Sequence, residues 1–219
     1  MTQQAIILAN GEIDNLATVQ ARLTGWKDAQ VIAADGGSRH AAALGLQPDA
    51  VVGDLDSLDA GLRTSFEAAG AHLEVRPTHK DETDLELSLL YAIRHGADHI
   101  VLLGALGGRL DMMLANLLLL LHPELIGIRV EIWSGRQTAW LIRPPGDDNV
   151  IGEPDDTLSL IPLLGDAEGV TTRGLAYPLS DETLAFSKPR GVSNVFTKRQ
   201  TQVMLRSGVL IAVHTPGRA

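Results

Sequence analysis

Hydrophobic and polar positions follow a regular order along the first half of the chain. Short aliphatic runs, each ending in Gly, Asp or Asn, are separated by longer segments that carry apolar residues at helical spacing. The runs predict strands at residues 5–9, 30–34, 51–53, 72–76 and 100–103, and helices at 16–23, 38–44, 58–69, 85–95 and 111–121. This alternation predicts an α/β domain built on a doubly wound, mostly parallel sheet.

The pattern changes after about residue 146. Turns rich in Gly, Pro, Thr and Asp separate short apolar runs at 157–162, 169–175, 183–186, 202–205 and 209–213. We therefore expect a small all-β domain, sandwich-like or barrel-like, at the C-terminal end. Pro144, Pro145 and Gly146 can continue neither helix nor strand, so we place the domain boundary between residues 143 and 144. The predicted domains are residues 1–143 and 144–219.

The most apolar segment, residues 112–121, is about half as long as the roughly 20 residues that a membrane span needs. It is interpreted as a buried helix whose leucines pack in the core. The N-terminal residues lack a basic region, and their apolar run is too short for a secretory signal. The expected location is the cytoplasm, with no membrane partner.

Composition narrows the chemistry. A formal net charge of −9 argues against a nucleic-acid partner, because phosphate binding requires clustered Lys and Arg. The chain has no cysteine, which excludes disulfides, thiolate zinc sites and cysteine nucleophiles. Any metal must therefore be held by oxygen or imidazole ligands, and the abundant carboxylates favour Mg²⁺.

Two acidic loops lie where ligands bind in such sheets, beyond the carboxyl ends of the strands. Asp54 and Asp56 flank one residue directly after a predicted strand, and the two-residue offset directs both carboxylates toward one side. A turn stabilised by an Asp side chain is an equally good explanation for this pair alone.

The second acidic loop holds Asp81 and Asp84 around Thr83, which begins a capping box completed by Glu86. Helix capping explains Asp84 and Glu86 adequately, but explains Asp81 less well. Taken together, the two loops suit Mg²⁺ bridging substrate phosphates, since a cation would neutralise the repulsion between crowded carboxylates.

Glycine-rich loops follow two other predicted strands. Asp35, Gly36, Gly37 and Ser38 open a helix, so their backbone amides suit a phosphate, although a tight turn is the plain alternative. The loop from 104 to 111 adds Arg109, whose planar fork of donors suits a polyphosphate; an ion pair with Asp111 is the alternative. Because no nucleophile elbow and no Walker lysine motif occurs, serine hydrolases and P-loop enzymes are disfavoured. Metal-assisted phosphoryl chemistry is the class indicated.

Five segments in order, 34–37, 53–57, 81–84, 107–116 and 191–194, closely resemble the thiamine pyrophosphokinase family. The resemblance implies transfer of the terminal diphosphate of ATP to the hydroxyl of thiamine, by direct attack on the β-phosphorus, with AMP as the leaving group. It implies Mg²⁺ as the metal and ATP as co-substrate. It also implies a homodimer, with the thiamine pocket supplied largely by the β domain at the subunit interface.

The resemblance also carries residue roles. By motif position, the metal ligands would be Asp54, Asp56, Asp81 and Asp84, and the nucleotide would contact Asp35, Gly36, Gly37, Ser38, Asp81 and Thr83. The catalytic set would be Asp54, Asp56, Asp84, Arg109 and Asp111. Met112 stands where many bacterial relatives have histidine, so no general base is assigned.

On the thiamine side, Ser193 and Asn194 match a family pair expected near the aminopyrimidine ring, which needs both donors and acceptors; a turn is the alternative. Tyr177 falls where some members have tryptophan, and its ring suits stacking on a cationic ligand. Two other functions remain open: a pyrophosphokinase acting on another hydroxymethyl heterocycle such as a pterin, or a non-catalytic sensor of nucleotide or thiamine diphosphate.

Overall fold

The computed structural model describes residues 3–77 and 81–217. The chain forms two compact units, Met1–Gly135 and Arg136–Ala219. The sequence placed the boundary later, at 143/144. The structure assigns β7 (Gln137–Ile142) to the second unit because it pairs along its length with β14 (Leu210–Thr215), a strand of that unit. Gly146, which was expected to continue neither helix nor strand, begins strand β8 (Gly146–Ile151).

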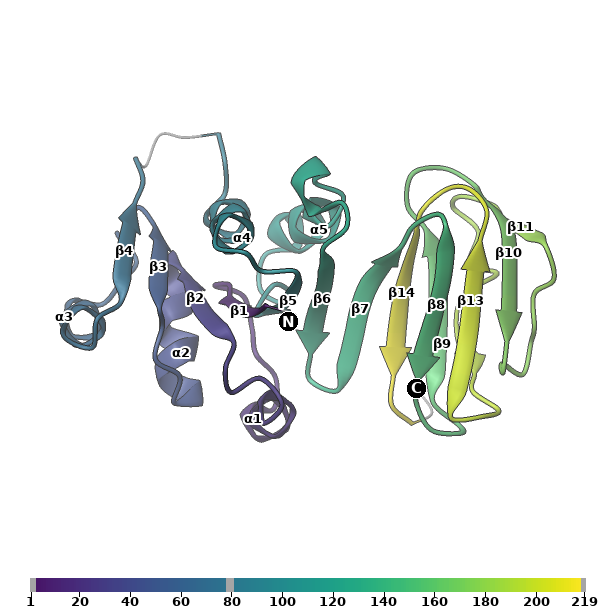
Figure 1. The fold of residues 1–219 in the computed structure, drawn as a ribbon, viewed down its shortest axis with the longest axis horizontal. Helices are drawn as coiled ribbons and strands as arrows, with labels where there is room; N and C mark the ends of the chain where they lie inside the picture. Colours follow the sequence, from purple (N-terminus) through teal and green to yellow (C-terminus); the bar gives the residue numbers. More distant parts are fainter. Residues whose placement is uncertain (1–2, 78–80, 218–219) are drawn as a thin grey trace. The chain divides into compact units, whose positions relative to one another are not determined.

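The first unit contains a parallel sheet of six strands in the order β6-β5-β1-β2-β3-β4. The strands are β1 (Gln4–Leu8), β2 (Gln30–Ala34), β3 (Ala50–Gly53), β4 (His72–Val75), β5 (His99–Leu103) and β6 (Arg129–Ser134). The helices are α1 (Leu16–Leu23), α2 (Ser38–Leu44), α3 (Ala60–Ala68), α4 (Asp84–Arg94) and α5 (Leu110–Leu119), with short 3-10 turns η1 (Asp35–Gly37) and η2 (Pro123–Leu125). Helices α4 and α5 lie on one side of the sheet, and α1 and α2 on the other (Figure 1). The predicted doubly wound α/β fold is confirmed, and β6 is an additional strand.

Side-chain caps fix where several of these helices begin. The Asn15 carboxamide accepts a hydrogen bond from the Thr18 amide, and Asp59 accepts from two amides in the first turn of α3. Thr83 accepts from the Glu86 amide at 3.2 Å, as the predicted capping box requires. These caps satisfy amides that have no partner within their own helix.

A tryptophan pair lies in the hydrophobic core of the first unit. The rings of Trp26 and Trp133 meet edge to face, with centroids 5.6 Å apart. The Trp133 indole donates to Oε2 of Glu131 at 2.9 Å, and Arg129 Nε donates to Oε1 at 3.1 Å. Burial alone would raise the pKa of Glu131, but its interactions with His99, Trp133 and Arg129 hold it at about 2.

Helix α5 departs from the sequence interpretation. Leu114 and Leu118 are 54% and 55% exposed, and Leu110 is also exposed, whereas Leu120 is 3% exposed. The expectation that this whole segment packs in the core was therefore wrong. The helix is apolar on nearly every side, so hydrophobicity alone could not identify the face that contacts the sheet. Among the described residues, none of the helices has the length and apolar character needed to cross a membrane.

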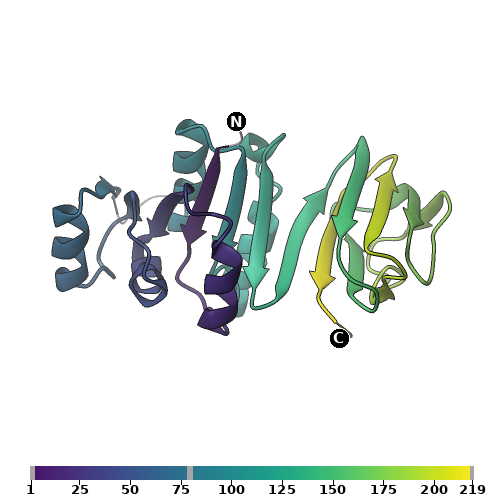
Figure 2. The same cartoon turned by 60° about the horizontal axis from the view of Figure 1, so that its bottom comes forward.

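The second unit is a sandwich of two antiparallel sheets, with orders β12-β9-β14-β7 and β11-β10-β13-β8. The further strands are β9 (Thr157–Pro162), β10 (Ala167–Arg173), β11 (Glu182–Leu184), β12 (Asn194–Val195) and β13 (Gln200–Leu205). Strands of both sheets contribute to one core, which includes Trp140, Leu158, Val170 and Val203. The Trp140 indole donates to Asp148 Oδ2 at 2.6 Å. The predicted all-β domain is confirmed, and its strands run from green to yellow in Figure 2.

Candidate active site

One pocket of the first unit lies at the point in the sheet where the strand order reverses. From β1 the chain continues through β2, β3 and β4 on one side, then returns to β5 and β6 on the other. The pocket, of about 390 Å³, is lined by residues 9–12 after β1, 34–36 and Arg39 after β2, 83–85 at the start of α4, and 105, 107–109, 112 and 116 after β5. This is the crevice beyond the carboxyl ends of the strands where open α/β sheets bind ligands.

Three carboxylates meet beside this pocket. One oxygen from each of Asp35, Asp54 and Asp84 lies within 4.8 Å of the other two. They come from the ends of β2 and β3 and from the first residue of α4, elements far apart in sequence. Asp56 and Asp81 are exposed and lie outside this cluster, so the structure brings together only part of the predicted metal set and adds Asp35.

Asp35 is the most buried member, at 6% exposure. Its Oδ1 atom is buried without a hydrogen-bond partner among the described residues. Burial raises the pKa of Asp35, and the charges of Asp84 and Asp54 raise it further, against hydrogen bonds from Ser57 and the Gly36 amide that lower it. Three carboxylates this close together, one of them with a buried oxygen that accepts no hydrogen bond from the described residues, form an arrangement that a divalent cation would stabilise, so the residues present fit a hard metal ion.

Gly53 makes this close approach possible. A Cβ atom at this position would lie 2.8 Å from Cβ of Asp35 and 3.1 Å from Oδ1 of Asp84. Its backbone φ of 153° is also one that residues with side chains rarely adopt. A side chain at the end of β3 would therefore displace Asp35, Asp84 or both.

The loop after β3 satisfies both explanations offered for Asp54. The Asp56 amide donates to Asp54 Oδ1 at 3.2 Å, which is the turn expected from an Asp side chain. Asp54 nevertheless belongs to the carboxylate cluster. Leu55, between them, has a φ of 63° and a buried side chain, so a hydrophobic anchor holds the loop in a strained backbone conformation.

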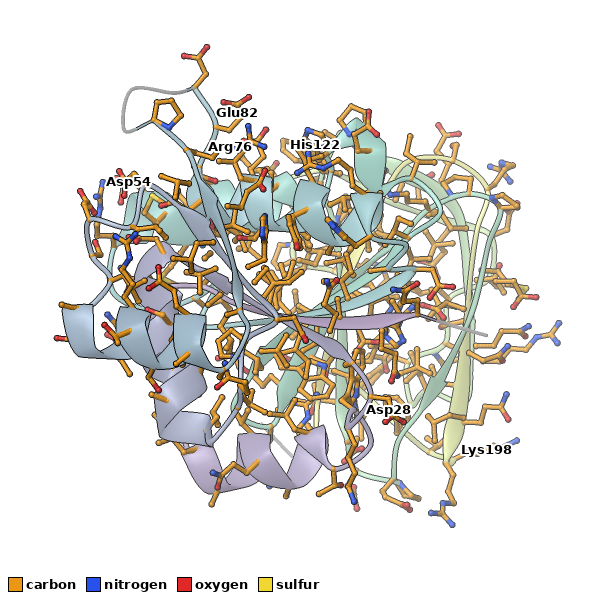
Figure 3. All side chains as sticks on the ribbon, turned by 60° about the vertical axis from the view of Figure 1, so that its left-hand side comes forward. Asp28, Asp54, Arg76, Glu82, His122 and Lys198 are labelled. Atoms are coloured by element: carbon orange, nitrogen blue, oxygen red, sulfur yellow. The ribbon has the colours of Figure 1, made fainter. Side chains whose placement is uncertain are left out.

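Figure 3 labels Asp54 on this loop and Arg76 at the end of the neighbouring strand β4. The Arg76 amide donates to the Gly53 carbonyl at 2.8 Å, so this contact continues the parallel pairing to the edge of the site. The figure also labels Glu82, one residue before the Thr83 cap of α4. The cap fixes the direction in which α4 begins, and with it the position of Asp84.

Several glycines at the pocket serve close backbone packing. A Cβ atom on Gly37 would overlap the Leu8 carbonyl, and one on Gly11 would overlap the carbonyls of Gly104 and Leu106. The Gly11 amide donates to Gly104 at 2.7 Å, which ties the loops after β1 and β5 together. Gly36 lines the pocket, whereas Gly37 and Ser38 are buried behind it. The predicted phosphate loop therefore presents only part of its backbone to the pocket.

Arg109 and Asp111 form an exposed two-point ion pair. Arg109 Nε donates to Oδ1 at 3.1 Å, and Nη2 donates to Oδ2 at 2.6 Å. The hydrogen bonds and charge of Arg109 lower the pKa of Asp111. Arg109 also lines the pocket, so both alternatives for this arginine hold in the structure.

Four other polar residues of this pocket were not predicted: Asn10, Glu12, Arg39 and Asn116. Arg39 donates from Nη2 to the carbonyls of Asn10 and Gly11, at 2.9 and 3.0 Å. Asn116 is buried among the leucines of α5 and donates to the Ala105 carbonyl at 2.7 Å. Two sequence signals could have identified Asn116: its place in the family motif at 107–116, and its amide among leucines, because a buried amide must find a polar partner.

The second unit has its own pocket, of about 360 Å³. It is lined by Leu160, Ala176, Tyr177, Pro178, Leu179, Arg190, Gly191, Val192 and Asn194. Tyr177 and Asn194 thus line the same pocket. Ser193 is absent from the lining; its φ is 59°, and its amide donates to Ser159 Oγ at 3.1 Å. Ser193 therefore occupies the turn that was its alternative interpretation.

Family comparisons agree with both units. The model of the thiamin pyrophosphokinase catalytic domain matches residues 23–132, and the model of the thiamin pyrophosphokinase vitamin B1 binding domain matches residues 148–210. The chain belongs to the thiamin pyrophosphokinase family.

Individual relatives support this membership along nearly the whole chain. A thiamine pyrophosphokinase of Bacillus subtilis (strain 168) is 29% identical over 198 residues, which cover 88% of this chain and 91% of the relative. A crystal structure of thiamine pyrophosphokinase from Bacillus subtilis superposes with a TM-score of 0.85, at 26% identity, covering 98% of this chain and 99% of that one. The thiamin pyrophosphokinase of Candida albicans has the same fold, with a TM-score of 0.81 at 17% identity, covering 98% and 89%.

Met112 stands at the position for which the sequence resemblance implied a histidine in many bacterial relatives. It lies in the first turn of α5 and lines the first unit's pocket. A thioether cannot accept a proton as an imidazole can. Met112 therefore cannot act as a base in this pocket.

Proposed function

We propose that this chain transfers the terminal diphosphate of ATP to the hydroxyl of thiamine, producing thiamine diphosphate and AMP. The observation that supports this most directly is the cluster of Asp35, Asp54 and Asp84 beside the pocket at the carboxyl ends of the strands, in a chain of the thiamin pyrophosphokinase family. A pocket of about 390 Å³ falls within the range that holds a small organic ligand.

The metal we propose is Mg²⁺, held by Asp35, Asp54 and Asp84. The buried Oδ1 of Asp35, which has no hydrogen-bond partner in the described part of the chain, supports this choice, as do the all-oxygen ligands. A bound Mg²⁺ would supply neutralisation of the charge on the polyphosphate. Asp56 and Asp81, which are exposed, remain predicted contributors from their motif positions.

The chain's own residues would orient the reactants. The polyphosphate would be bound by backbone groups at Gly36 and Gly107 and by two cationic side chains, Arg39 and Arg109. The thiamine hydroxyl oxygen would attack the β-phosphorus as the bond to the oxygen of AMP breaks. The hydroxyl proton would pass to a carboxylate or to solvent, because Met112 offers no basic nitrogen.

The second unit would bind thiamine, with Tyr177 stacking on a cationic or electron-poor ring of the ligand. We further propose that the protein is a homodimer and acts in the cytoplasm. Sedimentation at micromolar concentration tests the dimer, and a monomer alone would refute it. Fractionation of cells that produce the protein at natural levels tests the location.

The deciding experiment is an assay of the purified protein with ATP, Mg²⁺ and thiamine that follows AMP and thiamine diphosphate together. Equal release of the two products, abolished by a chelator, is expected. A hydroxymethyl pterin serves as the control substrate. Turnover of the pterin without turnover of thiamine would move the substrate to the other heterocycle, and nucleotide binding without AMP release would indicate a sensor.

Two matched variants test the metal ligands. Asp54→Asn should lower turnover by a factor of about 100 or more, because it removes a charged ligand from the cluster while preserving shape. Asp56→Asn, in the same loop but exposed and outside the cluster, should have a much smaller effect. Near-normal turnover in Asp54→Asn with a normal Mg²⁺ requirement would remove Asp54 from the metal site.

A further inference from the structure

Both polar atoms of the Asn194 side chain form hydrogen bonds with backbone groups, chiefly those of Tyr177. Its Nδ2 donates to the Tyr177 carbonyl at 2.7 Å, and its Oδ1 accepts from the Tyr177 amide at 3.0 Å. Oδ1 also accepts from the Val195 amide at 3.0 Å. Asn194 is 7% exposed, so these bonds form in a largely dry environment where an unmade bond would be costly.

These bonds extend a short antiparallel pairing by one residue. The Ala176 amide donates to the Val195 carbonyl at 2.8 Å, and Leu175 forms a bridge with Phe196. At the next position the carboxamide of Asn194 replaces a peptide group, offering one donor and one acceptor to Tyr177. Among side chains of this size only Asn offers both.

The bonds also join the two sheets of the second unit. The backbone of Asn194 lies in β12, paired with Leu158 of β9, whereas Tyr177 lies in the segment that follows β10 of the other sheet. The Tyr177 side chain is 71% exposed and, within the described part of the chain, makes no hydrogen bond or ring contact of its own. Its backbone therefore sets the position and direction of the Cα–Cβ bond from which the ring extends at the pocket rim.

We propose that Asn194 is a positioning residue that binds no part of the thiamine itself: it fixes the Tyr177 backbone so that the aromatic ring forms one wall of the thiamine pocket. This inference rests on the proposed function for the identity of the ligand. The two hydrogen bonds between the Asn194 side chain and the Tyr177 backbone, which we call the clamp, can be tested without turnover. The proposal replaces the expectation that the Asn194 carboxamide contacts the aminopyrimidine ring.

A double-mutant cycle distinguishes positioning from direct contact. Asn194→Ala should raise the KM for thiamine about tenfold while changing kcat and the KM for ATP little. In a Tyr177→Ala background the same substitution should have almost no further effect, because the residue through which Asn194 acts is gone. Full additivity of the two substitutions would overturn the proposal, because a direct ligand would still be lost. Asn149→Ala, at an exposed position of β8, is the matched control and should leave both KM values unchanged.

Amide hydrogen exchange gives a second readout that needs no activity. The Tyr177 amide should exchange slowly in the wild-type protein and much faster in Asn194→Leu, which is similar in size but offers no acceptor to this amide. Unchanged protection in Asn194→Leu would overturn the proposal, and this variant is available if Asn194→Ala fails to fold. If wild-type protein does not convert thiamine but the exchange result holds, the proposed substrate is wrong and the clamp stands.

Discussion

Substitution of Gly53 by alanine tests the geometry of the carboxylate cluster directly. The new methyl carbon would lie 2.8 Å from Cβ of Asp35, whereas ordinary van der Waals contact begins at 3.4 Å. Asp35, the end of β3 or both must shift by about 0.6 Å in total. The 3.1 Å approach to Oδ1 of Asp84 adds a second displacement in the same site. The cluster cannot keep its spacing in this variant.

The expected loss can be bounded from these displacements. A misplacement of about 1 Å costs roughly 100-fold in rate when positioning dominates catalysis, so Gly53→Ala should lower kcat by about 10- to 100-fold. The positive φ of Gly53 adds backbone strain of about 1–3 kcal/mol, which should lower the thermal midpoint. Both effects are measurable in one preparation, by AMP release and by thermal unfolding.

Gly70→Ala separates strain from displacement. Gly70 also has a positive φ, of 93°, but a Cβ atom there meets nothing within 4 Å. This control should lose stability and keep its turnover. If Gly53→Ala retains wild-type kcat while losing as much stability as Gly70→Ala, the cluster spacing does not govern the reaction and the reasoning fails.

Three other parts of the structure give further predictions. Glu131→Gln should lower the free energy of unfolding at neutral pH by up to about 3 kcal/mol, because the pKa of Glu131 is lower in the folded protein than the unfolded value of 4.5. This stabilisation is present above pH 4.5 and is lost as the pH falls toward 2, so a difference from wild type in urea unfolding that did not shrink below pH 4.5 would contradict it. Arg39→Gln should raise the KM for ATP about tenfold without changing that for thiamine, whereas Arg63→Gln on exposed α3 should change neither; equal effects would remove Arg39 from the nucleotide site. Leu120→Ala should cost about 2–5 kcal/mol and Leu114→Ala less than about 1 kcal/mol, as judged by denaturant midpoints; similar losses would mean that Leu114 is covered in solution.

Much of the fold was predictable because its signals are local. The runs at β2 and β9 and the helical periods of α1 and α2 coincide with the observed elements, since each carries its own pattern and ends at a breaking residue. Strand β8 was missed because its Asp-rich sequence lacks an apolar run; its pairing with β13 defines it instead. The exposed face of α5 was missed for the opposite reason, an excess of apolar residues on all sides.

The sequence identified residues of the site only through their positions in the loops that follow the strands. Polar residues after each strand identified Asp35, Asp54 and Asp84 individually, because parallel strands bring their carboxyl ends to one edge. Which carboxylates meet depends on backbone detail, such as the φ of Gly53, that no spacing rule contains. Likewise, the motif identified Asn194 but not the direction of its amide, which depends on a pairing across two sheets.

The placement of the three tryptophans makes the two units separately observable by intrinsic fluorescence. Trp26 and Trp133 lie together in the first unit, and Trp140 lies in the second. None of them lines either pocket, so ligand binding should not quench them by contact. In a Trp140→Phe protein, tryptophan emission would therefore come only from the first unit, and comparison with the parent would show in one denaturation series whether the units melt together or in sequence.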